Sequence, residues 1–273
     1  MHLKRWLTSI AAIPVLAALL IKAPPGPFAL FIALLSLICL WEYYRIVLSG
    51  LKPAAGIMIP LLGVFAGFAL LYAVYVSGWR HVPDIILANA LGAGILSLGR
   101  FKIHSGVVEV VSKQMQGLIY IPLALSTLIL LRMDPNGLRW IFFLLFIIFA
   151  GDAGAFYAGR FFGRHKLSPA ISPGKTVEGA IGGLLVNMAV GFGFKLFFLP
   201  DLPAAGCLFF CVAAGAAGQA GDLFESEFKR VRQIKDSGSI LPGHGGLLDR
   251  LDALLFAAPT AYLVKKYILV LFS

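Results

Sequence analysis

Nine long apolar runs divide the 273-residue chain, and they constrain its fold more than any other feature. They cover residues 6–21, 28–48, 57–77, 84–99, 117–131, 140–158, 177–199, 204–224 and 251–271. Each is about long enough for a helix to cross a hydrocarbon core of roughly 30 Å. Because backbone polar groups in lipid need partners within their own segment, such runs form helices. We predict an all-α, polytopic integral membrane protein with about nine transmembrane helices, of which the fourth and fifth are short.

The basic residues predict how these helices are oriented. With the N-terminus in the cytoplasm, 16 of the 23 Lys and Arg residues fall on the cytoplasmic side and 7 on the other. Cytoplasmic loops of membrane proteins carry such an excess. Topology therefore explains the formal net charge of +10, and no nucleic-acid partner is expected. No small-x-small cleavage site follows the first run, so we expect a retained helix rather than a signal peptide. The expected location is the cytoplasmic (inner) membrane.

Acidic residues separate the chain into two regions. Residues 1–150 contain four of them and residues 151–273 contain nine. Acidic groups at membrane depth are costly and are usually functional. We therefore predict a scaffold and lipid-facing region over 1–150, and a catalytic region with cytoplasm-facing polar loops over 151–273. The longest polar loop of the first region is expected at 100–116, with room for a short surface helix. The three cysteines lie in apolar runs, so no disulfide is expected.

The segment 226–252 places charged residues, glycines and a histidine between two apolar runs. Asp222 and Asp249 lie at the predicted cytoplasmic ends of these runs. Magnesium prefers one or two carboxylates together with water and substrate phosphates, so the pair predicts a Mg²⁺ site. Each residue also has a structural alternative. Asp249 could stabilise a helix N-terminus, and Asp222 and Glu225 could pair with Lys229 or Arg230.

The same segment supplies groups that bind phosphate. Lys229, Arg230, Lys235 and Arg250 would neutralise phosphate charge, although any cytoplasmic loop is basic. His244 lies in a Pro-Gly-His-Gly-Gly sequence, where it has no packing neighbour along the chain. We predict that it donates to a phosphate or positions a leaving group.

A second glycine-rich loop is expected at 159–176. It ends in Ser-Pro-Gly-Lys-Thr, which is superficially similar to a P-loop. The full GxxxxGK[ST] frame is absent and no strand is expected before it, so a P-loop fold is excluded. We instead predict a second phosphate contact where a helix begins, made by Ser172, Lys175 and Thr176. Glu178 either caps this helix or belongs to the nucleotide site.

Together the two segments resemble the signature of the phosphatidate cytidylyltransferases, also called CDP-diacylglycerol synthases. The matching residues are Ser226-x-Phe228-Lys229-Arg230, Lys235-Asp236-x-Gly238, Leu241-Pro242-x-His244-Gly245-Gly246-Leu247-x-Asp249-Arg250-Leu251-Asp252 and, upstream, Ser172-Pro173-x-Lys175-Thr176-x-Glu178-Gly179. Length and span count also agree, whereas the first half matches only in hydropathy. In one departure, Ala153 and Phe156 follow Asp152 where the family often has a hydroxyl residue and then Tyr. This argues against a hydroxyl role there.

The resemblance implies the reaction CTP + phosphatidate → CDP-diacylglycerol + pyrophosphate, with Mg²⁺ and at the cytoplasmic membrane face. It implies that Asp222 and Asp249 bind the metal and are catalytic with Lys229 and His244. The implied substrate-binding residues are Ser226, Arg230, Lys235, Asp236, Arg250, Lys175, Ser172, Thr176 and Glu178. A phosphomonoester is already a competent nucleophile, so positioning and charge neutralisation suffice. Acyl-chain preference, a second cation and the oligomeric state, a homodimer included, stay open.

Two alternatives remain at this point. One is a CTP-using enzyme that acts on another lipid phosphate or on a polyprenol. The other is a secondary transporter, which would have inverted repeats and acidic residues in span centres of both halves. The first half lacks such residues, and this disfavours the transporter.

Overall fold

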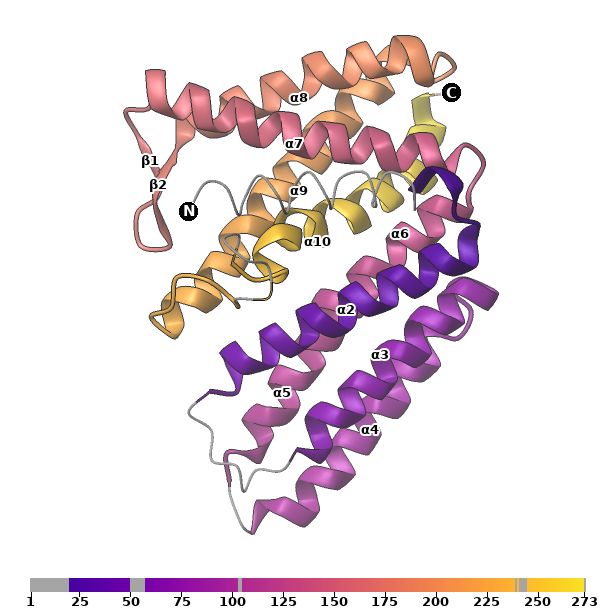
Figure 1. Ribbon diagram of the computed structural model, residues 1–273, viewed down its shortest axis with the longest axis vertical. Helices are drawn as coiled ribbons and strands as arrows, with labels where there is room; N and C mark the ends of the chain where they lie inside the picture. The colour runs from indigo at the N-terminus through magenta and orange to yellow at the C-terminus, as the bar shows by residue number, and fades with distance from the viewer. Residues whose placement is uncertain (1–19, 50–56, 103–104, 239, 241–244, 273) are drawn as a thin grey trace. The chain divides into compact units, whose positions relative to one another are not determined.

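The computed structural model describes residues 20–49, 57–102, 105–238, 240 and 245–272 (Figure 1). Within these residues it contains eight helical segments that are long and apolar enough to cross a membrane. They coincide with eight of the nine predicted spans, which confirms a polytopic, mostly helical membrane protein. The remaining predicted span, 6–21, lies outside the described residues apart from its last two.

The helices and strands follow one another along the chain as α2 (Pro25–Val47), α3 (Met58–Ser77), α4 (Val82–Phe101), α5 (Val107–Leu118), the π-helical turn η2 (Ile119–Leu123), α6 (Ala124–Met133), α7 (Gly137–Phe162), β1 (Lys166–Ser168), β2 (Ser172–Thr176), α8 (Val177–Phe198), α9 (Ala204–Val231), α10 (Leu248–Leu263), η3 (Val264–Ile268) and η4 (Leu269–Phe272). They form two compact units. The first unit comprises Met1–Leu130 with Val231–Arg250, and the second comprises Leu131–Arg230 with Leu251–Ser273.

The fourth and fifth of the predicted spans are longer than expected. The fourth is a helix of 20 residues, and the fifth is a continuous helical segment of 27 residues, Val107–Met133. Most of the polar loop expected at 100–116 is therefore helix α5, which continues through η2 into α6. Pro122 lies inside η2 and has no N–H to donate, which is consistent with a local π-turn within a long helix.

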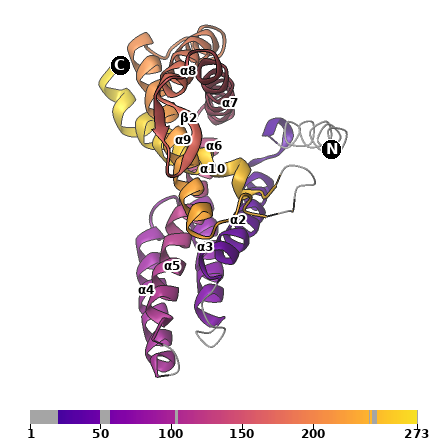
Figure 2. The same cartoon turned by 90° about the vertical axis from the view of Figure 1, so that its left-hand side faces the viewer.

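Helices α2 to α5 pack side by side in the first unit (Figures 1 and 2). The polarity of residues 107–116, which predicted a loop, is partly buried inside this bundle. The amide of Asn89 donates to Gln114 Oε1 at 3.3 Å, and Gln114 donates back to Asn89 Oδ1 at 3.0 Å. Because both polar side chains are fully paired, helix α5 can lie among apolar neighbours.

In the second unit, α7 and α8 lie along one another (Figure 1). Small residues permit this close approach, as is usual between membrane helices. A Cβ at Gly182 would lie 2.2 Å from Ala158 Cβ, and a Cβ at Gly191 would lie 2.2 Å from Cys211 Sγ of α9. The second unit is thus held together by glycine contacts that no larger residue could replace without movement.

The two strands form an antiparallel hairpin at the end of α7 and the beginning of α8 (Figure 1). Strand β2 consists of the Ser-Pro-Gly-Lys-Thr residues themselves, so the expectation of no strand in this region was wrong. The strand belongs to a two-stranded hairpin and the GxxxxGK[ST] frame is absent, so the segment is still not a P-loop.

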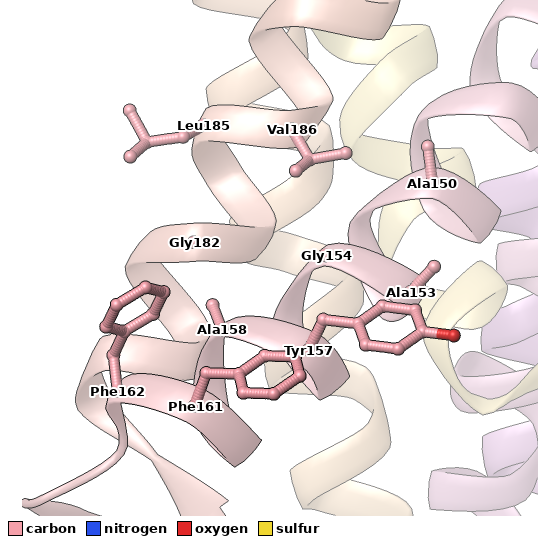
Figure 3. A pocket seen from close by; sticks show the side chains of 10 residues that line it. All are labelled: Ala150, Ala153, Gly154, Tyr157, Ala158, Phe161, Phe162, Gly182, Leu185 and Val186. Carbon is pink, nitrogen blue, oxygen red and sulfur yellow. The ribbon is translucent and has the colours of Figure 1, made fainter.

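Helices α7 and α8 also border an apolar groove of about 610 Å³ (Figure 3). Tyr157 supplies the one polar side chain of its lining. The lining residues are Ala150, Ala153, Gly154, Tyr157, Ala158, Phe161, Phe162, Gly182, Leu185 and Val186. None of the site residues predicted from the sequence belongs to this groove.

Candidate functional site

Asp222 lies near the C-terminal end of α9 and contacts the second glycine-rich segment. Its Oδ2 atom is 2.6 Å from Nζ of Lys175 on β2, and both side chains are partly exposed. The hydroxyl of Ser226, one turn further along α9, is directed at Oδ1 from 3.5 Å. The upstream motif therefore meets the end of α9, just before the downstream motif begins at Ser226, through an ion pair in the second unit.

Two further carboxylates surround this ion pair. Asp152 of α7 and Asp252 of α10 each interact electrostatically with Asp222, and Asp152 also interacts with Lys175. Sequence reasoning assigned no site role to Asp152 or Asp252. Asp252 also interacts with Lys229, so these carboxylates have two ammonium groups within electrostatic range.

The basic residues at the end of α9 have partners within the second unit. Lys229 forms an ion pair with Glu225, which is completely buried. Arg230 donates from Nε to the carbonyl oxygen of Ile171 at 2.8 Å, so it ties the hairpin turn to α9. The structural alternative considered for Glu225 is therefore confirmed by its pairing with Lys229, whereas Asp222 pairs with Lys175 of the hairpin.

Thr176 and Glu178 shape the start of α8. Thr176 is the N-cap residue, and its Oγ1 accepts from the backbone N–H of Gly179 at 3.1 Å. Glu178 accepts from the backbone N–H groups of Arg164 and His165, at 3.0 and 3.2 Å, and lies 2.6 Å from His165 Nδ1. Thr176 thus caps α8, whereas Glu178 binds the segment between α7 and β1 and so holds the hairpin against the start of α8. Ser172 pairs with Ser168 across the hairpin.

Asp249 lies in the first unit, in the first turn of α10. Its Oδ2 atom accepts from the backbone N–H of Ser237 at 2.9 Å, from the Ser237 hydroxyl at 3.0 Å and from the backbone N–H of Gly246 at 2.8 Å. Gly246 lies just before α10, so this bond shows that Asp249 stabilises the N-terminal end of the helix, as its structural alternative predicted. These bonds also set the direction of the carboxylate.

Glu42 of α2 was missed by sequence reasoning, which treated the first 150 residues as scaffold. It is completely buried and accepts from the backbone N–H groups of Leu247 and Leu248, at 3.1 and 2.8 Å, and from the Ser237 hydroxyl at 3.1 Å. A signal was available: Glu42 is an acid inside a predicted membrane span, and such residues are usually functional.

The remaining predicted residues are distributed as follows. Lys235, Asp236 and Arg250 are exposed in the first unit. His244 lies outside the described residues. Asp222 and Asp249 belong to different units, each of which is described by itself, so their pairing stays a prediction. Among the described residues, no three His, Cys, Asp or Glu side chains are grouped so as to hold a metal ion.

Comparison with known proteins shows what the chain is similar to. A model of the cytidylyltransferase family matches residues 3–268. A phosphatidate cytidylyltransferase of Bacillus subtilis (strain 168) is 42% identical over 156 residues, which are 57% of this chain and 56% of that protein. One from Haemophilus influenzae is 33% identical over 278 residues, covering 94% of this chain and 96% of its own. One from Staphylococcus epidermidis is 34% identical over 261 residues, covering 93% and 95%. With the match extending over nearly its whole length, the chain belongs to the cytidylyltransferase family.

Proposed function

We infer that the protein is a phosphatidate cytidylyltransferase, which transfers the cytidylyl group of CTP to phosphatidate and releases pyrophosphate. Relatives of that name cover nearly the whole chain. One structural observation supports the inference most directly. The 2.6 Å ion pair between Lys175 and Asp222 joins the Ser-Pro-Gly-Lys-Thr strand to the end of α9, so a group suited to phosphate and a group suited to a cation lie together.

In the proposed reaction an oxygen of the phosphatidate phosphate attacks the α-phosphorus of CTP. A new P–O bond forms, the bond from the α-phosphorus to the oxygen bridging it to the β-phosphate breaks, and pyrophosphate leaves. Both substrates and the transition state are highly anionic, so the protein chiefly has to position and neutralise charge. Lys175 is placed to do this. We propose that Arg230, Lys235 and Arg250 assist with exposed charge, that Ser226 and Asp236 help to position the substrates, and that His244 donates to the leaving group.

A Mg²⁺ ion suits the donor set of this chain. Carboxylate oxygens are its preferred protein ligands, and Asp222 lies within electrostatic range of two further carboxylates, those of Asp152 and Asp252. We propose Asp222 and Asp249 as its ligands. When bound, the ion would neutralise phosphate charge as the α–β bond breaks. Lys175 orients the Asp222 carboxylate, and the Ser237 and Gly246 amides orient that of Asp249.

The proposed site faces the cytoplasm. The loops that carry the motifs lie on the side that has 16 of the 23 basic residues. By the positive-inside rule, this side is the cytoplasmic one. CTP is a cytoplasmic nucleotide and phosphatidate is a bilayer lipid, so a site at this boundary would receive both.

The test is release of pyrophosphate by the purified protein in detergent with CTP, phosphatidate and Mg²⁺. Asp222→Asn should lower turnover by about 10²-fold or more, because neutralisation by a bound cation is worth several kcal/mol and about 1.4 kcal/mol corresponds to tenfold. Asp201→Asn is the matched control, since Asp201 is exposed beyond the opposite end of α9. An inactive wild-type protein, or an Asp222→Asn variant at the wild-type rate, would contradict the assignment.

Labelled CTP separates the alternative substrates. Phosphatidate, other lipid phosphates and polyprenyl phosphates are compared as acceptors under the same conditions. We expect the cytidylyl label to move to phosphatidate. Labelling of another acceptor alone would retain the enzyme class and change the substrate.

A further inference from the structure

We propose that Glu42 is a positioning residue for the transferase site: it holds the backbone that directs the Asp249 carboxylate. The proposal rests on the proposed function. Glu42 lies on α2, more than 190 residues before the segment it contacts, yet it belongs to the same compact unit as residues 231–250.

Both oxygens of the Glu42 carboxylate are used by this segment. Oε1 accepts from the Leu247 N–H at 3.1 Å, and Oε2 accepts from the Leu248 N–H at 2.8 Å. Oε2 also lies 3.1 Å from the Ser237 hydroxyl, whose single hydrogen it shares with Asp249. A buried carboxylate is tolerated when such donors replace its water. The first N–H groups of a helix have no partners within the helix, and its N-terminus favours negative charge. Glu42 therefore fixes where α10 begins.

Ser237 connects Glu42 to Asp249. Its hydroxyl lies 3.1 Å from Glu42 Oε2 and 3.0 Å from Asp249 Oδ2, and its backbone N–H also donates to Asp249 Oδ2. Gly246, next to the Glu42-bound Leu247, donates to the same Asp249 oxygen at 2.8 Å. The donors that orient Asp249 are thus themselves held by Glu42.

Glycines allow the carboxylate to sit directly against this backbone. A Cβ at Gly238 would lie 2.3 Å from Glu42 Oε1, and one at Gly246 would lie 2.6 Å from Glu42 Oε2. The backbone at Gly238 and at Gly246 is therefore packed tightly against the Glu42 carboxylate. Such tight packing is expected of a residue that fixes the direction of a metal-binding carboxylate.

The decisive variant is Glu42→Gln. An amide has one oxygen, so its NH₂ group must face either the Leu247 N–H or the donors at Leu248 and Ser237. Partners that orient metal ligands typically change affinity or activity by 10- to 100-fold. We expect a fall in kcat of about 10- to 100-fold and a higher Mg²⁺ concentration for half-maximal rate, with a smaller change in the KM for CTP.

Two controls separate positioning from general stability. Glu109→Gln makes the same chemical change at an exposed site of the first unit. Asn89→Leu breaks the buried pair with Gln114, away from the 231–250 segment. Glu109→Gln should behave as wild type. Asn89→Leu should lower the melting temperature while leaving the Mg²⁺ dependence unchanged.

Hydrogen–deuterium exchange supplies a readout that does not depend on turnover. In Glu42→Gln, amide exchange across residues 245–250 should rise, and in both controls it should stay at the wild-type level. Unchanged exchange and kcat in Glu42→Gln would overturn the proposal. So would a loss of kcat that Asn89→Leu reproduces at an equal fall in melting temperature.

If Glu42→Gln does not fold, Ser237→Ala decides the question. It removes the shared hydroxyl and leaves the bonds from Leu247 and Leu248 in place. Faster exchange at 245–250 and a raised Mg²⁺ requirement support the proposal, and wild-type values of both overturn it. An inactive wild-type protein would contradict the proposed function, while the exchange data would still report on the contact of Glu42 with the segment.

Discussion

Gly246→Ala should disrupt the site although it adds a single methyl group. The new Cβ would lie 2.0 Å from Ser237 Oγ, 2.6 Å from Glu42 Oε2 and 2.7 Å from the Gly238 backbone nitrogen. Favourable contacts between heavy atoms occur at about 3.5–4.0 Å, so each neighbour would have to withdraw by roughly an ångström. The Ser237 hydroxyl can rotate away, whereas the Gly238 nitrogen moves only with the backbone.

The cost follows from these contacts. Overpacking a filled site costs about 1–3 kcal/mol. Rotation of Ser237 also gives up its hydrogen bond to a carboxylate, which contributes about 1.5–3 kcal/mol. Together these amount to about 2.5–6 kcal/mol. If this energy displaces the loop rather than unfolding the protein, about 3 kcal/mol already leaves about a hundredfold fewer molecules in the native arrangement.

Pyrophosphate release and thermal unfolding in detergent check this prediction. Gly246→Ala should lose about a hundredfold or more of its kcat/KM. The matched control is Gly94→Ala in α4, where an added Cβ meets nothing within 4 Å. There the melting temperature should hold or rise slightly, because Ala is favoured over Gly in a helix by up to about 1 kcal/mol. If Gly246→Ala matches Gly94→Ala in both measurements, the close packing around Gly246 has been misjudged.

Two further predictions concern the second unit. Lys175→Met removes the ammonium 2.6 Å from Asp222 and should lower the rate of pyrophosphate release at saturating substrate by at least about tenfold. The control, Lys166→Met, changes an exposed position of the same hairpin and should keep the wild-type rate. Equal rates in the two variants would exclude a site role for Lys175. Helix α9 has 28 residues and a length of about 42 Å, enough to cross the bilayer. A cysteine at Val231 should therefore react with a membrane-impermeant thiol reagent from the cytoplasmic side and one at Asp201 from the other side, and labelling of both from one side would refute the topology.

The membrane-spanning architecture could be predicted because it depends on local information. In a bilayer, an apolar run of sufficient length has to form a helix that satisfies its own backbone, whatever its neighbours are. Hydropathy therefore located eight spans that the structure confirms. It failed at 107–116, where Gln114 is buried and paired with Asn89 from another helix. Hydropathy along the chain cannot show such a partner.

The motif residues were also visible in the sequence, since their spacing is typical of a family that acts on phosphates. The structural roles of these residues were harder to predict. Thr176 was predicted to contact phosphate, and in the structure it is the N-cap of α8. Glu178 was predicted to cap α8 or to belong to the nucleotide site, and in the structure it accepts from the backbone N–H groups of Arg164 and His165 beside the hairpin. The Lys175–Asp222 ion pair required the hairpin to lie beside the end of α9.

Glu42 marks the limit of what the sequence could reveal. A single acid within an apolar span indicates a need for a partner, but three donors supplied from residues 237–248 become apparent only when the chain is folded. Hydropathy and helix formation act over a few turns and can be read along the chain. Hydrogen bonds between segments about 200 residues apart depend on how the helices pack, so the support of the Asp249 loop was settled by tertiary structure alone.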